Sequence, residues 1–176
     1  MHPVYTWDQG GSKANGYGFQ SSKMYIRAGA GTNQWAEAHS APAVLYKVVN
    51  DFDVQVLLEF SSGSSTFAGM GVRRIEDEEW WLRVGRTGSK LVVDVGLGGS
   101  SGQPKTVAYT RNSVYLKISK RGEYFYFFYS TDGSRWASLY SAKMTQSKTV
   151  YVYFTTFAWG SSSTSAWFSN YRVGLR

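Results

Sequence analysis

Residues 52–60 read Phe52-Asp53-Val54-Gln55-Val56-Leu57-Leu58-Glu59-Phe60, and apolar and mostly polar side chains alternate along them. Successive side chains of a β-strand point to opposite faces of the sheet, so a repeat of two residues is typical of a strand. Every second residue from Phe52 to Phe60 is apolar, and the residues between them are polar except Leu57. The stretch therefore predicts a strand with one core face and one mixed face.

The same period recurs along almost the whole chain, and no long helical pattern interrupts it. Turn signals separate the periodic segments: Asn50-Asp51, residues 85–88, Arg121-Gly122, and Asp132-Gly133, a pair that suits a tight hairpin. We expect thirteen strands, at residues 16–20, 23–29, 42–48, 52–60, 67–74, 79–86, 90–97, 105–110, 113–120, 123–130, 135–141, 148–158 and 165–174. Local turns without helical crossovers predict an all-β fold, a two-sheet antiparallel β-sandwich of the jelly-roll type.

Composition indicates one globular domain. The chain has 176 residues, of which 43% are hydrophobic, 17% aromatic and 18% charged, and it contains no cysteine. Disulfides and thiolate metal sites are therefore excluded, and no apolar run reaches the roughly 20 residues of a membrane helix. The formal charge is +7, but the lysines and arginines are scattered, so we expect neither a nucleic-acid nor a membrane partner. We interpret residues 1–176 as a single domain excised from a larger protein.

Aromatic side chains give the strongest functional signal, because sugar rings stack their C–H faces on Trp and Tyr while their hydroxyls seek polar partners. Trp81 and Arg83 alternate with Trp80, Leu82 and Val84, which we assign to the core. A second alternating row begins at Tyr151 and runs to Trp159. The predicted carbohydrate-binding surface combines these rows with polar groups: Trp81, Arg83, Asp53, Gln55, Glu59, Arg73, Asp94, Tyr151, Tyr153 and Trp159. We expect Trp136 to seal the core after a hairpin, and Trp7 and Trp35 are open candidates for loop-borne stacking platforms.

Catalytic constellations are weaker in this sequence. A glycoside hydrolase needs two carboxyl groups across a cleft. Asp53 and Glu59 share a strand face but lie roughly 20 Å apart along an extended chain, whereas Glu59 with Asp94 or Glu123 remains an open cross-strand combination. The carboxylates of residues 76–79 are predicted to lie in an exposed hairpin loop. His2 and His39 are the only histidines, and no Gly-x-Ser-x-Gly elbow is present.

Several motifs occur in order along the chain: residues 40–42, 51–54, 68–73, 81–85, 116–118 and 168–173, and the hairpin Tyr129-Ser130-Thr131-Asp132-Gly133-Ser134-Arg135-Trp136. Together they resemble the concanavalin A-like sandwich domains of the DUF1349 type, which are related to laminin-G-like folds and to modules of glycoside hydrolases. The resemblance covers most of the chain and implies a two-sheet jelly roll with a carbohydrate-binding or accessory role. Relatives often have Asp where this chain has Ser169. That departure argues against a calcium ion, for which Asn50 and Asp51 are the candidate ligands.

The sequence therefore favours a non-catalytic carbohydrate-binding module that is attached to a glycoside hydrolase. The expected ligand is a polysaccharide or oligosaccharide, no cofactor is expected, and we expect a secreted or cell-surface monomer. The alternative is a small jelly-roll glycanase or polysaccharide lyase, because length, basic charge and aromatic content also resemble small family 11 xylanases. Glu123-Tyr124-Phe125 is the nearest match to their glutamate motifs. A protein-binding or cell-wall adhesion domain is the third class.

Overall fold

The computed structural model describes residues 6–9, 14–33, 41–61, 63–77 and 79–176. These residues form fourteen strands: β1 (Thr6–Asp8), β2 (Gly16–Gln20), β3 (Lys23–Ala28), β4 (Ala43–Val49), β5 (Phe52–Glu59), β6 (Thr66–Arg74), β7 (Trp80–Thr87), β8 (Lys90–Leu97), β9 (Ser101–Ala108), β10 (Ser113–Arg121), β11 (Tyr124–Ser130), β12 (Ala137–Lys143), β13 (Thr149–Ala158) and β14 (Thr164–Leu175). In the described ranges, no helix is long and apolar enough to cross a membrane.

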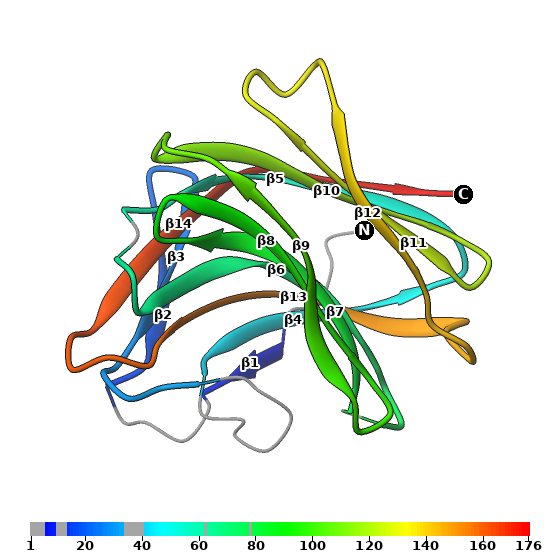
Figure 1. The fold of residues 1–176 in the computed structure, drawn as a ribbon, viewed down its shortest axis with the longest axis horizontal. Helices are drawn as coiled ribbons and strands as arrows, with labels where there is room; N and C mark the ends of the chain where they lie inside the picture. Colours follow the sequence, from blue (N-terminus) through cyan, green and yellow to red (C-terminus); the bar gives the residue numbers. More distant parts are fainter. Residues whose placement is uncertain (1–5, 10–13, 34–40, 62, 78) are drawn as a thin grey trace.

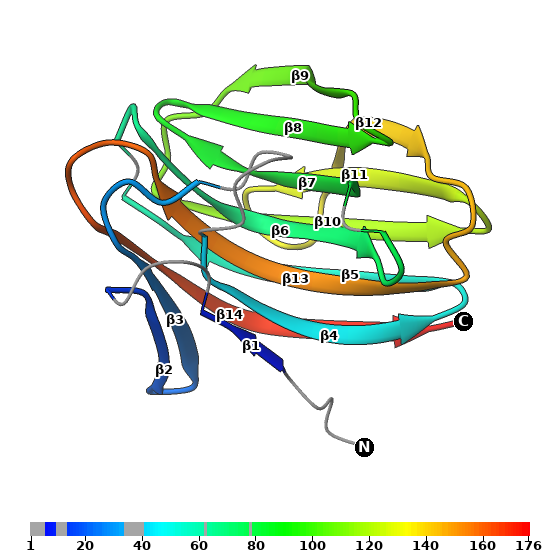
Figure 2. The same cartoon turned by 90° about the horizontal axis from the view of Figure 1, so that it is seen from below.

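The strands form two seven-stranded sheets that pack face to face. Sheet A has the order β1-β4-β13-β6-β7-β8-β9, and sheet B has the order β12-β11-β10-β5-β14-β3-β2. All pairings between the named strands are antiparallel. Figure 1 shows two curved layers, and the concave side of sheet A faces away from sheet B. Figure 2 looks onto that outer side of sheet A. The predicted two-sheet β-sandwich is confirmed.

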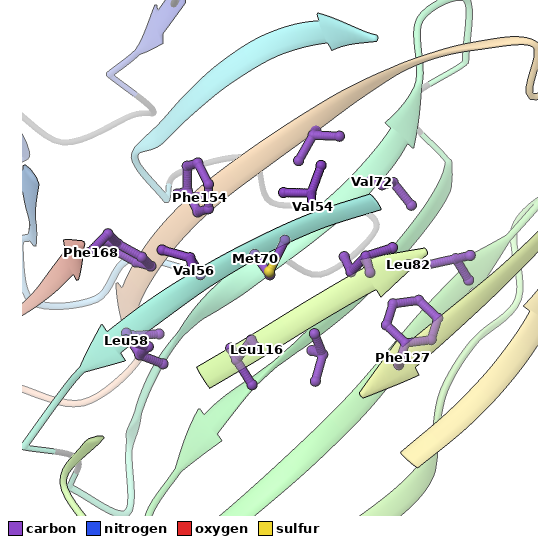
Figure 3. Close-up of a cluster of buried hydrophobic side chains, with 14 of the residues drawn as sticks. Val54, Val56, Leu58, Met70, Val72, Leu82, Leu116, Phe127, Phe154 and Phe168 are labelled. Atoms are coloured by element: carbon purple, nitrogen blue, oxygen red, sulfur yellow. The ribbon is translucent and has the colours of Figure 1, made fainter. Parts of the chain in front are cut away.

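The core lies between the two sheets and consists of the alternating apolar residues that define the strands. Phe52, Val54, Val56 and Leu58 of β5 are fully buried and Phe60 is 2% exposed. Figure 3 shows Val54, Val56 and Leu58 of β5 close to Met70 of β6 and Leu116 of β10. Burial of one such side chain contributes about 1.5–3 kcal/mol. The predicted core face of residues 52–60 is therefore confirmed.

The predicted hairpin at Asp132-Gly133 joins β11 to β12. The Asp132 carboxylate accepts hydrogen bonds from the backbone N–H groups of Ser134 and Arg135, at 2.8 and 2.9 Å. Gly133 has a φ of 76°, which glycine adopts without steric cost. These bonds hold the pKa of Asp132 well below its usual range, because they favour the charged carboxylate.

Two strands differ from the sequence-based expectation. β1 was not predicted, because three residues are too short for a period to be recognised. β9 begins at Ser101 rather than at residue 105. It is the edge strand of sheet A, so polar residues and Pro104 are tolerated there and the alternation is lost.

Two further local predictions are wrong. Residues 85–87 continue β7, and the turn comes at Gly88, which has a φ of 53°. Trp136 does not seal the core: it is half-buried on the outer face of sheet B, where the Lys117 Nζ lies 4.2 Å from its ring centroid. A bulge between Phe127 and Phe128 shifts the register of this hairpin, and that shift is invisible in the period of the sequence.

Candidate functional site

The outer face of sheet A carries an unusual set of buried side chains, contributed by β6, β7, β8 and β13. Leu82 and Val84 point into the core as predicted, so Trp81 and Arg83 point to the outer face. The same alternation places Val152 in the core and Tyr153 on the outer face of β13. On this face Trp81 is only 5% exposed and Tyr153 only 2%.

A buried ion pair lies at the centre of this face. Arg83 of β7 is paired in register with Asp94 of β8, and the Arg83 Nε donates to Asp94 Oδ2 at 2.8 Å. The side chains are 1% and 2% exposed. Gln103 Nε2 donates to the second carboxylate oxygen of Asp94 at 2.8 Å. Removal of two charges from water costs several kcal/mol per ion, so good geometry and further hydrogen bonds are required to retain such a pair.

A bulge between β8 and β9 places Gln103 beside the Arg83–Asp94 ion pair. Val93 pairs with Lys105 and Val95 pairs with Gly102, so Gln103 and Pro104 both lie opposite Asp94. The extra residue in an antiparallel pair bends the strand and redirects a side chain, and proline is accommodated at such positions. The edge strand thereby places the amide of Gln103 beside the buried carboxylate.

Three aromatic rings surround the guanidinium of Arg83. Its Cζ lies 4.7 Å from the ring centroid of Trp81, 4.8 Å from that of Phe157 and 5.0 Å from that of Phe67. The Phe67 and Phe157 rings stack on each other at 4.7 Å. Cation–π contacts of this kind are strongest where the cation is desolvated. The three rings and the ion pair together form the buried floor of this face.

Glycines on neighbouring strands allow these rings to lie flat on the sheet. A Cβ at Gly96 would come within 2.3 Å of the Trp81 Nε1, and a Cβ at Gly71 within 2.4 Å of the Tyr153 Cζ. Both glycines are the direct cross-strand partners of these aromatic residues. The pairing therefore requires glycine, since any side chain would lift the ring from the sheet.

Tyr153 is a buried phenol that stays protonated at neutral pH. Burial raises its pKa to about 12, although the nearby Arg83 and Arg73 favour the phenolate.

Arg73 lies over the ring of Tyr151, with its Cζ 5.6 Å from the centroid. Both residues line a hollow of about 300 Å³, together with Thr6, Trp7, Asp8, Gln9 and Leu45. Trp7 packs its ring on Tyr17 at 4.4 Å and also contacts the core.

A larger hollow lies beside Trp159, which is 43% exposed and follows β13. This Trp159 hollow has a volume of about 630 Å³. Besides Trp159 and Gly88, it is lined by residues with hydrogen-bonding side chains: Asn33, Ser64, Thr87, Ser89, Lys90 and Gln103. The Trp159 ring rests against Phe157 at 5.7 Å. Gln103 connects the hollow directly to the buried Arg83–Asp94 pair.

The structure divides the ten predicted site residues between the two sheets. Seven lie in sheet A or directly after one of its strands: Arg73, Trp81, Arg83, Asp94, Tyr151, Tyr153 and Trp159. Asp53, Gln55 and Glu59 lie on β5 in sheet B. The expectation that all ten form one surface is therefore wrong. The outer faces of the two sheets are turned away from each other.

The carboxylates considered for catalysis do not meet in the structure. Glu59 is on the outer face of sheet B, where Lys23 Nζ lies 2.6 Å from Glu59 Oε2. Asp94 is buried in sheet A, and Glu123 accepts from the backbone N–H of Gln146 beyond the end of β10. These three carboxylates therefore form no pair across a shared cleft. Asp77 and Glu79 lie in a loop between β6 and β7, as predicted, whereas Glu78 lies outside the described residues.

The candidate calcium ligands have other contacts. Asp51 Oδ1 accepts from the N–H of Gly122 at 2.8 Å and lies 3.5 Å from Lys120 Nζ. An ammonium group at this distance competes with a cation, so the site fits calcium poorly. The described residues include no group of three or more His, Asp or Glu side chains that could hold a metal. His2, Trp35 and His39 lie outside the described residues.

Sequence reasoning missed the polar residues of the Trp159 hollow. Ser64, Ser89 and Lys90 lie in turns or at a strand end, where polar residues are expected for solubility alone. The spacing of Gly69 and Gly71 in β6 was a signal for the buried floor instead, because the Tyr153 ring lies across Gly71. Glycine weakens a strand interior, so two of them on one face indicate that something large lies across the strand.

Several solved structures resemble this chain in fold at low sequence identity. A functionally unknown protein from Saccharomyces cerevisiae superposes with a TM-score of 0.83 at 18% identity, over 98% of this chain and 96% of that chain. A bifunctional GH43-CE protein from Bacteroides eggerthii gives a TM-score of 0.80 at 16% identity, over 100% of this chain but 24% of that chain. The carbohydrate-binding module CBM66 from Bacillus subtilis gives 0.64 at 10% identity, over 97% and 95%.

This chain thus spans about a quarter of the Bacteroides protein and nearly all of the yeast protein and of the CBM66 module. A search of curated protein sequences found no match. The family described as "Protein of unknown function (DUF1349)" matches residues 17–175, which include all strands except β1 and the first residue of β2. With this match and the two-sheet sandwich, the chain belongs to the DUF1349 family.

Proposed function

We propose that this protein is a non-catalytic carbohydrate-binding module that holds a glycan on the outer face of sheet A. The observation that carries the proposal is the Trp159 hollow, where a 43% exposed indole borders a polar hollow of about 630 Å³. A sugar ring stacks on such an indole through its apolar C–H face, and its hydroxyls require hydrogen-bonding groups at the ring edge. Lys90, Gln103 and Ser89 supply donors and acceptors there.

The buried floor supports this site by fixing its geometry. Gln103 is held by Asp94, and Asp94 is held by Arg83. The amide therefore enters the hollow from a position that needs no ordering when a ligand binds, and such preorganisation lowers the entropic cost of association. Trp81, Tyr153 and Arg83 act in this proposal beneath the ligand, as the support of the contact residues.

The fold comparisons support a module that functions beside other domains. The similar part of the Bacteroides protein is a fraction of a longer chain described as bifunctional GH43-CE, and the Bacillus subtilis protein is itself described as a carbohydrate-binding module. By analogy, this domain would be secreted or at the cell surface, linked to a glycoside hydrolase whose substrate it binds. The separation of Glu59, Asp94 and Glu123 favours binding over hydrolysis.

A binding screen over neutral and acidic polysaccharides, by affinity gel electrophoresis, tests this function, with sugar release measured on the same polymers. The expected result is retention without release. Trp159→Ala should weaken binding to the retained polymer by roughly 1–3 kcal/mol, since aromatic stacking contributes on that scale. Phe19→Ala is the matched control, because Phe19 is a 67% exposed aromatic residue on β2 of sheet B.

Full affinity of Trp159→Ala for a retained neutral polymer would show that the glycan does not use this hollow. Sugar release by the purified wild-type protein would replace the proposal with an enzyme. Absence of binding to every polymer would favour the protein-adhesion class.

A further inference from the structure

We propose that the outer face of sheet B is a second binding surface, specific for polysaccharides that carry carboxylates, such as polyuronides. It is independent of the Trp159 hollow, from which it is separated by the core of the sandwich. The face belongs to β12, β11, β10, β5 and β14, which are consecutive neighbours in sheet B.

One row of side chains crosses these strands in register. Ser138 pairs with Phe128, Phe128 with Lys117, Lys117 with Gln55, and Gln55 with Arg172. Two cations thus lie on either side of an amide, two strand spacings or about 10 Å apart. A linear polymer that follows the row meets an ammonium group, an amide and a guanidinium group in turn.

Aromatic rings flank the first of these cations. Lys117 Nζ lies 4.2 Å from the ring centroid of Trp136 and 4.7 Å from that of Phe128. Burial against this surface lowers the pKa of Lys117, although the nearby Asp53 opposes the change. Rings beside a fixed cation suit a sugar acid, which has an apolar ring face and one charged group.

The second cation is placed by a bulge. The register between β14 and β5 shifts between Ser169 and Arg172, and Asn170 has a φ of 51°. A non-glycine residue in this conformation costs free energy, and bulges redirect side chains at functional edges. Here the shift brings Arg172, rather than Tyr171, opposite Gln55.

Charge on this face is unbalanced in favour of cations. Asp53 is held by two guanidinium groups, with Arg121 Nη2 and Arg176 Nε both at 2.8 Å. Within the ranges that the structure describes, no carboxylate forms an ion pair with Lys117 or Arg172. The two carboxylates of β5 are therefore neutralised, and the row retains two cations for an anionic ligand.

The probe is polygalacturonate, with its highly methyl-esterified form as the neutral counterpart and double-stranded DNA as a polyanion without uronate. Affinity electrophoresis at low and high salt compares the wild type with K117Q/R172Q, and with K105Q/K148Q as a control of equal charge loss elsewhere. We expect polygalacturonate to retain the wild type. Its affinity should fall about tenfold in K117Q/R172Q but less than twofold in K105Q/K148Q. Added salt should also weaken the binding of the wild type. Lys117→Arg keeps the charge at this position and should retain binding.

Trp159→Ala separates this surface from the proposed sheet A site. Unchanged polygalacturonate binding in Trp159→Ala is expected, and loss there would assign the acidic glycan to sheet A instead. The proposal is overturned by equal losses in the two double variants, by equal affinity for the esterified polymer or for DNA, or by no retention of the wild type. None of these outcomes alters the test of neutral glycan binding at Trp159.

Discussion

Replacement of Asp94 by asparagine tests whether the buried ion pair supports the fold of sheet A. The substitution keeps the shape of the side chain but removes the charge that faces Arg83, whose side chain is 1% exposed. Loss of one partner of a buried pair costs about 3–5 kcal/mol, because the remaining charge stays in a poorly solvated position. For a domain of this size, each 1 kcal/mol lowers the melting temperature by about 2–4 °C, so a decrease near 10 °C is expected.

Glu59→Gln is the matched control, because it also removes the carboxylate of an ion pair. The Lys23–Glu59 distance of 2.6 Å is shorter than the 2.8 Å of Arg83–Asp94, but its side chains are 42% and 36% exposed. Exposed pairs contribute about 0–1 kcal/mol because water screens them. The control should therefore melt within about 3 °C of the wild type, although its pair is the shorter one.

Urea unfolding followed by tryptophan fluorescence and by circular dichroism gives both free energies, provided that the two probes coincide. Arg83→Met/Asp94→Leu should be more stable than Asp94→Asn, since no charge is left buried. An Asp94→Asn protein within about 1 kcal/mol of the wild type would refute the reasoning, as would a Glu59→Gln protein that is destabilised equally.

Two further predictions concern the backbone and the response to acid. Gly71→Ala should destabilise the protein by about 1–3 kcal/mol in thermal melts, because the new Cβ would lie 2.4 Å from the Tyr153 Cζ. Gly102→Ala is the control and should be tolerated, because no atom lies within 4 Å of the position of its Cβ. Asp132 has a lowered pKa in the folded state. Its contribution to the free energy of unfolding is therefore complete above its pKa in the unfolded chain, near 3.9, and is lost as the pH falls through its pKa in the folded protein. Urea unfolding between pH 2 and 5 should therefore depend less on pH in Asp132→Asn, and an identical slope would contradict the hydrogen-bonded hairpin.

Local sequence rules were accurate wherever one physical factor dominated. The alternation in residues 52–60 predicted the buried face of β5, and the same rule separated Leu82 from Arg83 in β7. The rule worked because both sheets have one face in a common core, so the period of each strand is enforced by burial. It failed for β9, an edge strand with few buried residues.

Prediction of which side chains face outward was accurate within a strand, whereas the grouping of these side chains across strands was wrong. Arg83 and Asp94 were both selected as polar residues of outer faces, and the structure pairs them in register. Glu59 was selected on the same grounds but lies in the other sheet. The polar residues of the Trp159 hollow were not selected, because they come from separate turns that only the folded chain brings together.

The period of two within each strand was enough to predict a sandwich of antiparallel strands and, where the alternation is regular, which side chains face the core and which face outward. The order of the strands was known only from the folded chain. It places Asp53 and Gln55 on one outer face, and Trp81 and Arg83 on the other. The physical reason is that an outward-facing polar side chain looks the same in either sheet. Strand order depends instead on pairings between distant segments, such as β5 with β14 and β6 with β13.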